Sequence, residues 1–296
     1  MKILIIGSSG LIGTALTSYL QIQGFEVGRL LRYKQDKHPY WIINDNSFHL
    51  KEFSHPDIII NLAGDNIASG RWTEKKKQKL LDSRLQTTQR LVEHFKNTPP
   101  TLFINASAIG FYGETGNNVV DENSPAGSGF ASELALRWEE KSAPIESKKT
   151  RLVKIRTGIV LSNKGGALPK MLPAFKAGLG GRIGSGKQMM SWIDINDLCH
   201  AILFIIQQPQ LSGAINLVSP HPVTNQLFSQ KLSKQLSRPC LLPLPEFIVK
   251  ALFGEMGKEL LLASTYVKPS KLIEAGFDFE YKYVQESLFQ QLKKKP

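Results

Sequence analysis

The chain has 296 residues, of which 42% are hydrophobic and 21% charged, and its formal net charge is +12. This size predicts one dominant domain with a smaller lobe, and no apolar run reaches the roughly 18–20 residues that cross a bilayer. Two cysteines, Cys199 and Cys240, exclude a disulfide framework, and no metal-ligand cluster surrounds them. We therefore expect no metal site and a reducing, cytoplasmic location.

The first half of the chain alternates between strand and helix patterns. Short apolar, β-branched runs that end at glycine or polar residues predict strands, and runs with helical periodicity predict helices. Strands are predicted at 2–7, 25–32, 56–64, 101–108 and 151–161, with a short one in 38–46, and helices at 11–24, 72–95 and 130–141. This alternation predicts an α/β fold of the Rossmann type, a doubly wound parallel sheet with helices on both faces.

The regular alternation of strand and helix patterns ends after about residue 163. A glycine-rich stretch at 165–188 predicts loops with one short helix, and its apolar residues favour part of a site over a linker. A helix at 194–208, a strand at 213–220 and a helix begun by Thr224 or Asn225 follow. We expect a Rossmann domain at 1–165, its sheet completed near 190–220, and a small, mostly helical C-terminal substrate lobe at 166–188 and 221–296.

The sequence "GSSGLIG" joins the first strand to the first helix. Gly7 permits the tight turn, Gly10 lets backbone approach a pyrophosphate, and Gly13 lets the helix press on the sheet. The unpaired amides of the helix N-terminus then attract phosphates. Because the strand, loop and helix occur in the required order, the motif predicts a dinucleotide site, against the alternative of a turn without a ligand.

The second strand indicates which dinucleotide binds. An NAD site carries an acid roughly 20 residues after the loop, which accepts from the ribose 2′-hydroxyl. Here the strand ends on Arg32. A guanidinium there pairs with a 2′-phosphate, so we predict NADP(H); the alternative is that Arg32 only solvates the strand end.

These residues resemble the extended short-chain dehydrogenase/reductases, and longer stretches narrow the match. "NLAGDNIASGRW", "NASAIGFYG", "GSGKQMMSWIDINDL" and "GEMGKELLLAS" look like the atypical group called epimerase family protein, within the NAD(P)-dependent epimerase/dehydratase-like proteins, which has its own C-terminal domain. The resemblance covers nearly the whole chain and implies NADP(H) binding. Many relatives place a His where Asp194 stands, so a catalytic role at this position is not expected.

Loop and resemblance together give the predicted cofactor-binding set. It comprises Gly7, Ser9, Gly10, Leu11, Ile12, Gly13, Arg32, Leu62, Ala63, Gly64, Arg84 and Ser107. Leu62 to Gly64 would line the nucleotide. Arg84, on the long helix, would reach a phosphate or remain a surface residue.

The usual proton-transfer pair of this superfamily is missing. A Tyr and a Lys four residues apart on one helix face move the substrate proton, and a Ser holds the substrate oxygen. Ser107 fits the Ser, but Phe130 and Leu134 stand where the pair is expected. We predict Ser107 and Tyr112 as catalytic residues; the alternative for Tyr112 is packing beside Phe111.

Three functions follow in order of preference. The first is an NADP(H)-dependent oxidoreductase or epimerase-like isomerase acting on a small molecule, an anionic one if Arg156 and Lys187 bring charge to its cleft. The second is a non-catalytic NADP(H)-binding sensor or partner-docking module. The third, a nucleic-acid binder, is disfavoured because the run from Lys75 to Lys77 lies on a helix without interleaved aromatics. We expect no nucleic acid and no membrane partner, and a monomer or homodimer.

Overall fold

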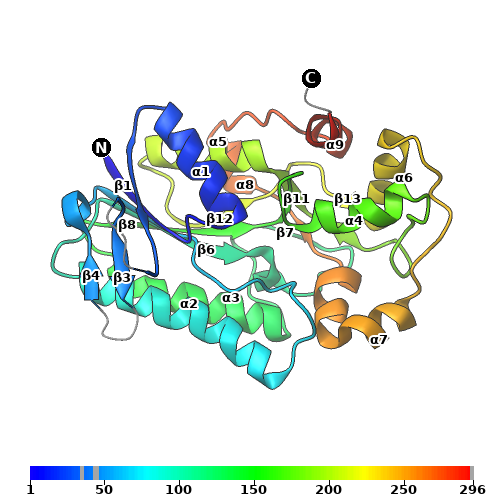
Figure 1. The fold of residues 1–296 in the computed structure, drawn as a ribbon, viewed down its shortest axis with the longest axis horizontal. Helices are drawn as coiled ribbons and strands as arrows, with labels where there is room; N and C mark the ends of the chain where they lie inside the picture. Colours follow the sequence, from blue (N-terminus) through cyan, green and yellow to red (C-terminus); the bar gives the residue numbers. More distant parts are fainter. Residues whose placement is uncertain (34–36, 43–46, 294–296) are drawn as a thin grey trace.

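A six-stranded parallel sheet forms the centre of the protein, as Figure 1 shows. The computed structural model describes residues 1–33, 37–42 and 47–293. The strand order is β12-β8-β6-β5-β1-β2. The strands are β1 (Lys2–Ile6), β2 (Glu26–Leu30), β5 (Ile58–Asn61), β6 (Leu102–Ala108), β8 (Arg151–Thr157) and β12 (Gly213–Leu217). The order reverses between β1 and β5, so a ligand crevice is expected at the carboxyl ends of these two strands.

Helices cover both faces of the sheet (Figure 1). Ile3 and Ile5 of β1 pack in one core with α1 (Leu11–Ile22) and α5 (Ile195–Gln207). The alternate residues Leu4 and Ile6 face the opposite core, which contains α2 (Glu74–Phe95), and α3 (Phe130–Ser142) packs beside α2. Because side chains alternate along a strand, the continuous apolar runs of the sequence fill both cores. The predicted fold class is confirmed.

Two predicted strands differ in detail. The strand predicted at 151–161 is divided at Gly158, where a Cβ would lie 2.6 Å from the Ser191 carbonyl oxygen. Its second part, β9 (Ile159–Leu161), leaves the central sheet and pairs with β11 (Trp192–Asp194). The short strand predicted in 38–46 is β3 (Tyr40–Ile42), which pairs antiparallel with β4 (Ser47–His49) outside the central sheet; residues 43–46 lie outside the described part of the chain.

The C-terminal part is mostly helical, as predicted. Its helices are α4 (Ala167–Lys176), α6 (Asn225–Gln235), α7 (Glu246–Gly257), α8 (Ser270–Glu274) and α9 (Val284–Leu292). Short strand pairs connect it to the sheet domain: β10 (Met189–Met190) with β13 (Val223–Thr224), and β7 (Val119–Val120) with β14 (Tyr266–Val267). None of the helices in the described part of the chain has the length and apolarity that a bilayer crossing needs.

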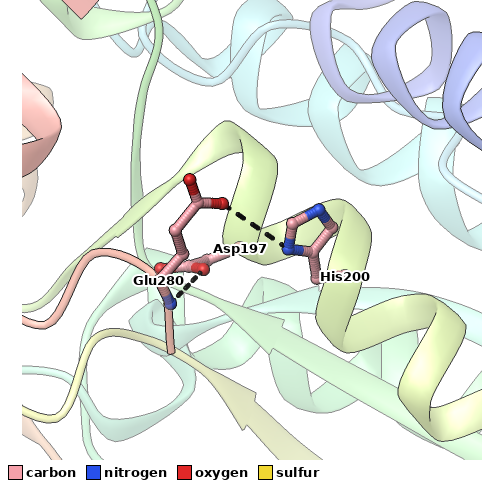
Figure 2. A group of neighbouring side chains, drawn as sticks. All are labelled: Asp197, His200 and Glu280. Atoms are coloured by element: carbon pink, nitrogen blue, oxygen red, sulfur yellow. Dashed lines mark hydrogen bonds and ion pairs between the residues drawn. The ribbon is translucent and has the colours of Figure 1, made fainter. Parts of the chain in front are cut away.

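A buried carboxylate attaches the C-terminal segment to α5. Both oxygens of Asp197 accept backbone N–H groups, from Glu280 at 2.9 Å and Tyr281 at 3.0 Å. Figure 2 shows Asp197 and His200 on α5, with Glu280 facing them from the neighbouring segment. Asp194, which caps α5, similarly accepts from Ser287.

This attachment predicts a pH dependence of stability. Burial raises the pKa of Asp197 to about 6, although the two N–H groups work in the opposite direction. The folded state then binds a proton more tightly than the unfolded state, so the contribution of this group to the unfolding free energy falls as pH rises from about 4 to about 6. We expect Asp197→Asn to flatten this part of the stability profile, measured by urea unfolding at several pH values. Asp278→Asn, at an exposed site in the same segment, is the control; equal slopes in both variants would contradict the assignment.

Candidate functional site

The glycine loop lies at the carboxyl end of β1. Gly7 has a φ of +77°, and a Cβ there would lie 2.7 Å from the Leu62 carbonyl carbon. At Gly13 a Cβ would lie 2.3 Å from the Gly7 carbonyl oxygen. These two glycines are therefore required by protein backbone that passes close to them.

Gly10 differs from its two neighbours in the motif. Its φ is −76°, and the nearest atom to an added Cβ is 3.4 Å away. It is the N-cap of α1, no side chain caps the helix, and the first turn carries no acid. The amides of this turn are left for an anion, and nothing within the described residues fills the space beside Gly10. The loop thus fits a pyrophosphate.

A second feature of the loop supports this fit. The hydroxyl of Ser8 is buried, and no hydrogen-bond partner for it exists among the described residues. An unpartnered buried hydroxyl costs free energy, and such groups often face a ligand. Sequence reasoning named Ser9 and did not single out Ser8.

Arg32 follows β2 and lines a cavity of about 540 Å³ against one face of α2. Lys75, Lys79 and Arg90 of α2 line the same cavity, and Asp82 is its acidic residue. Four cations and one carboxylate make the cavity attractive to an anion. The helix pattern alone gave no sign that Lys75 and Lys79 face Arg32, because they lie more than forty positions away in the sequence.

The turn after β5 contains Leu62, Ala63 and Gly64, which the sequence predicts to line the nucleotide. Leu62 and Ala63 pass directly over Gly7, as the contact at Gly7 requires. Gly64 lies against Arg84, whose guanidinium carbon would be 3.0 Å from a Cβ at position 64. The structure thus places this turn beside the glycine loop, and its contact with the nucleotide stays a prediction.

The buried side chain of Arg84 supports the turn after β5. It is 8% exposed, and its guanidinium donates to the carbonyl oxygens of Asp65 and Leu80. Burial lowers the pKa of Arg84 to about 10, so it remains charged at neutral pH. It is therefore neither a surface residue nor a side chain extended into the crevice in this structure.

Ser107, at the end of β6, is part of a buried ion-pair network. Its hydroxyl donates to Glu139 of α3 at 2.7 Å. Arg156 of β8 binds both oxygens of Glu139, at 2.8 and 3.0 Å. Burial works to lower the pKa of Arg156, but the Glu139 carboxylate raises it. The charge of Arg156 is neutralised here, so the expectation that Arg156 brings positive charge to an open cleft is wrong.

Tyr112 extends the same network. Its hydroxyl accepts from Arg156 at 2.9 Å and donates to Asn216 of β12 at 2.8 Å. The residue is 3% exposed, and burial raises its pKa to about 12. The structure therefore brings Ser107 and Tyr112 together through Glu139 and Arg156, and both proton donors are already engaged.

Phe130 and Leu134, which the sequence places where the usual Tyr and Lys are expected, are packing residues. Leu134 is 2% exposed and packs with Trp72, and Phe130 lies beside both. Glu259 of the C-terminal lobe accepts from the backbone amides of Phe130 and Ala131, at 3.1 and 2.8 Å. A carboxylate from a distant segment thus caps the helix that would carry the Tyr and Lys.

Asp197, His200 and Glu280 form a group that sequence reasoning did not single out (Figure 2). Their candidate ligand atoms lie within 4.8 Å of one another. These distances between ligand atoms are large for three atoms that would each lie about 2.0–2.6 Å from one ion. Asp197 is also fully buried, with both oxygens bound to amides. The geometry fits an anchor for the C-terminal segment, and the predicted site residues include no metal ligand.

Comparison with known proteins defines the class. Residues 3–217 match the model of the NAD dependent epimerase/dehydratase family, and residues 244–290 match a domain of unknown function, DUF1731. The chain belongs to the NAD dependent epimerase/dehydratase family. The resemblance drawn from the sequence motifs is confirmed.

Particular relatives span the whole chain. An epimerase family protein of Mycobacterium bovis is 42% identical over 96% of this chain and 95% of its own length. The crystal structure of the human epimerase family protein SDR39U1 with NADPH has a TM-score of 0.90 at 33% identity, covering 98% of both chains. A Thermus thermophilus UDP-glucose 4-epimerase has a TM-score of 0.77 at 16% identity, over 98% of this chain and 97% of its own, and shares the fold.

The contacts around Gly10 and Gly13 predict different effects of substitution on stability and on NADPH binding. We expect Gly10→Ala to keep the unfolding free energy within about 1 kcal/mol of the wild type, because its Cβ meets no protein atom closely. The same Cβ would enter the space of the phosphates, so NADPH affinity should fall at least about tenfold. Gly13→Ala should instead destabilise the fold by about 1–3 kcal/mol. Thermal melts and calorimetry check both; an unchanged NADPH affinity in Gly10→Ala would contradict the site.

Proposed function

We propose that the protein binds NADP(H) along the glycine loop, with the 2′-phosphate in the cationic cavity beside Arg32. The observation that carries this proposal is the position of Arg32, Lys75 and Lys79 around one cavity. The NADPH in the human relative supports the same assignment. Lys79 already pairs with Asp65 at 3.3 Å. A 2′-phosphate would add a charged partner for Arg32 and Lys75, which a 2′-hydroxyl would not supply.

We further propose a hydride-transfer function on a small-molecule substrate. NADP(H), when bound, supplies or accepts the hydride. Ser107 would hold the substrate oxygen. Because its proton is donated to Glu139, its oxygen presents lone pairs, and this arrangement suits a substrate hydroxyl better than a carbonyl.

Tyr112 stays the predicted acid in this proposal. A pKa of about 12 keeps its hydroxyl protonated at neutral pH, as an acid requires. The proton is donated to Asn216, so transfer to a substrate needs that hydrogen bond to break. The same observation favours the second candidate, a non-catalytic NADP(H)-binding module, because the proton-transfer groups are buried and engaged.

Calorimetry with NADPH and NADH tests the cofactor assignment. We expect Arg32→Gln to weaken NADPH about 10- to 100-fold, because one charge-assisted hydrogen bond contributes about 1.5–3 kcal/mol. NADH affinity should not change. Arg137→Gln, on the exposed face of α3, is the matched control. Equal losses for NADPH and NADH, or wild-type binding of neither, would overturn the assignment.

Nicotinamide absorbance during incubation with panels of carbonyl compounds, alcohols and sugar nucleotides tests catalysis. For any substrate found, we expect Ser107→Ala and Tyr112→Phe to reduce turnover by about 100-fold or more. Tyr283→Phe, at a half-exposed site, should turn over normally. Turnover that survives both substitutions contradicts the catalytic roles, and retained NADPH without any turnover supports the binding module.

A further inference from the structure

Five large apolar side chains of the C-terminal lobe are exposed. They are Leu179 at 58%, Leu241 at 75%, Leu242 at 52%, Phe247 at 71% and Leu252 at 57% exposure. Single exposed leucines are common on protein surfaces, but a contiguous group usually marks an interaction site. We call these five residues the apolar patch.

Backbone contacts bring together the segments that carry Leu179, Leu241 and Leu242. Residues 176–187 and 236–245 run side by side, since Leu244 donates to the Arg182 carbonyl oxygen and Gly184 donates to that of Leu244, both at 2.8 Å. A Cβ at Gly181 would lie 2.1 Å from the Leu242 carbonyl oxygen. The helix α7 starts directly after the second segment, with Phe247 in its first turn.

The two segments beside α7 that carry patch residues are basic. The segments 176–187 and 236–245 contain no Asp or Glu, and their exposed cations are Lys176, Arg182, Lys187 and Arg238. Arg238 donates to the Lys176 carbonyl oxygen, which places two of these cations together. On α7, Lys250 and Glu246 form an ion pair at 2.6 Å and neutralise each other. The patch thus combines exposed apolar side chains with the four cations of the same segments, which we call its positive rim.

We propose that the apolar patch docks on the surface of an anionic lipid bilayer. Apolar side chains enter the boundary between headgroups and acyl chains, while the cations bind the lipid phosphates. A second copy of the chain is a poorer occupant, because a symmetric contact would bring two positive rims face to face. The absence of a spanning run, on which the expectation of no membrane partner rests, does not exclude a protein that lies on the surface.

The patch lies toward one end of the molecule. Figure 1 shows α7, and the segment that leads to it from α6, at the end opposite β3 and β4. Of the residues that line the cationic cavity, Arg32 and Trp41 belong to the β3 end, whereas Lys75 lies at the start of α2, where Lys77 pairs with Glu255 of α7. The inference does not depend on the proposed function.

Vesicle sedimentation of the full chain tests the inference. We expect the protein to pellet with vesicles that contain phosphatidylglycerol and not with phosphatidylcholine alone, and added salt should weaken the binding. The double variant Leu241→Gln/Phe247→Gln should lose most of the binding, whereas Phe289→Gln, at an exposed site on α9, should not. Arg238→Gln should weaken it about fivefold, and Lys96→Gln less.

Three results would overturn the proposal. One is no pelleting with anionic vesicles at low salt. The second is equal binding by the double variant and Phe289→Gln, which would leave only diffuse attraction to the net charge. The third is a concentration-dependent dimer, seen by sedimentation equilibrium and lost in the double variant, which would assign the patch to a second copy. Melting temperatures of all variants confirm that each is folded.

Discussion

The close approach of three backbone segments at the carboxyl edge of the sheet is the constraint on which the rest of the site depends. The glycine loop, the first turn of α1 and the turn after β5 come so near one another that Gly7 and Gly13 have no room for a side chain. This packing holds the α1 amides at the point where the strand order reverses. The same turn carries Gly64, which rests on Arg84. A dinucleotide site of this kind is thus made of backbone, and its side chains mainly hold that backbone in place.

A buried polar network stands near the site where the superfamily usually keeps a tyrosine and a lysine. It runs from Ser107 through Glu139 and Arg156 to Tyr112 and Asn216. The guanidinium carbon of Arg156 also lies 3.4 Å from the centroid of the Phe111 ring. A buried pair of charges is tolerated because each hydrogen-bonding position is filled, and removing one member would leave the others unpaired. This network fixes which way the Ser107 proton points.

Carboxylates attach the C-terminal segment to α2, α3 and α5. Glu259 caps α3, and Glu255 pairs with Lys77 of α2. In the opposite direction, Asp197 of α5 accepts a hydrogen bond from the backbone of the C-terminal segment. Glu259 lies in a π-helical turn, after Gly254 breaks α7 with a φ of +59°. Irregular turns of this type often occur at functional sites. The domain of unknown function is therefore attached to the helices that border the cofactor crevice.

Local signals explain how much the sequence predicted. Strands and helices alternate with clear periods. The glycine loop occupies seven consecutive residues, and Arg32 is the last residue of the second predicted strand. Each of these features depends on neighbours in the chain, so fold class and cofactor loop could be inferred from residue order. The division of strand 151–161 could not, because Gly158 turns away to meet Ser191.

By itself, the sequence determined the doubly wound sheet and the dinucleotide loop, and it predicted that the usual proton-transfer pair is missing. Only the tertiary structure decided which groups from distant parts of the chain form hydrogen bonds with one another. Tyr112 meets Asn216 across 104 positions, and Glu259 reaches α3 across 128. Such contacts arise where separate strands and helices end at one edge of the sheet. No local pattern encodes them, because each partner is chosen by packing in three dimensions.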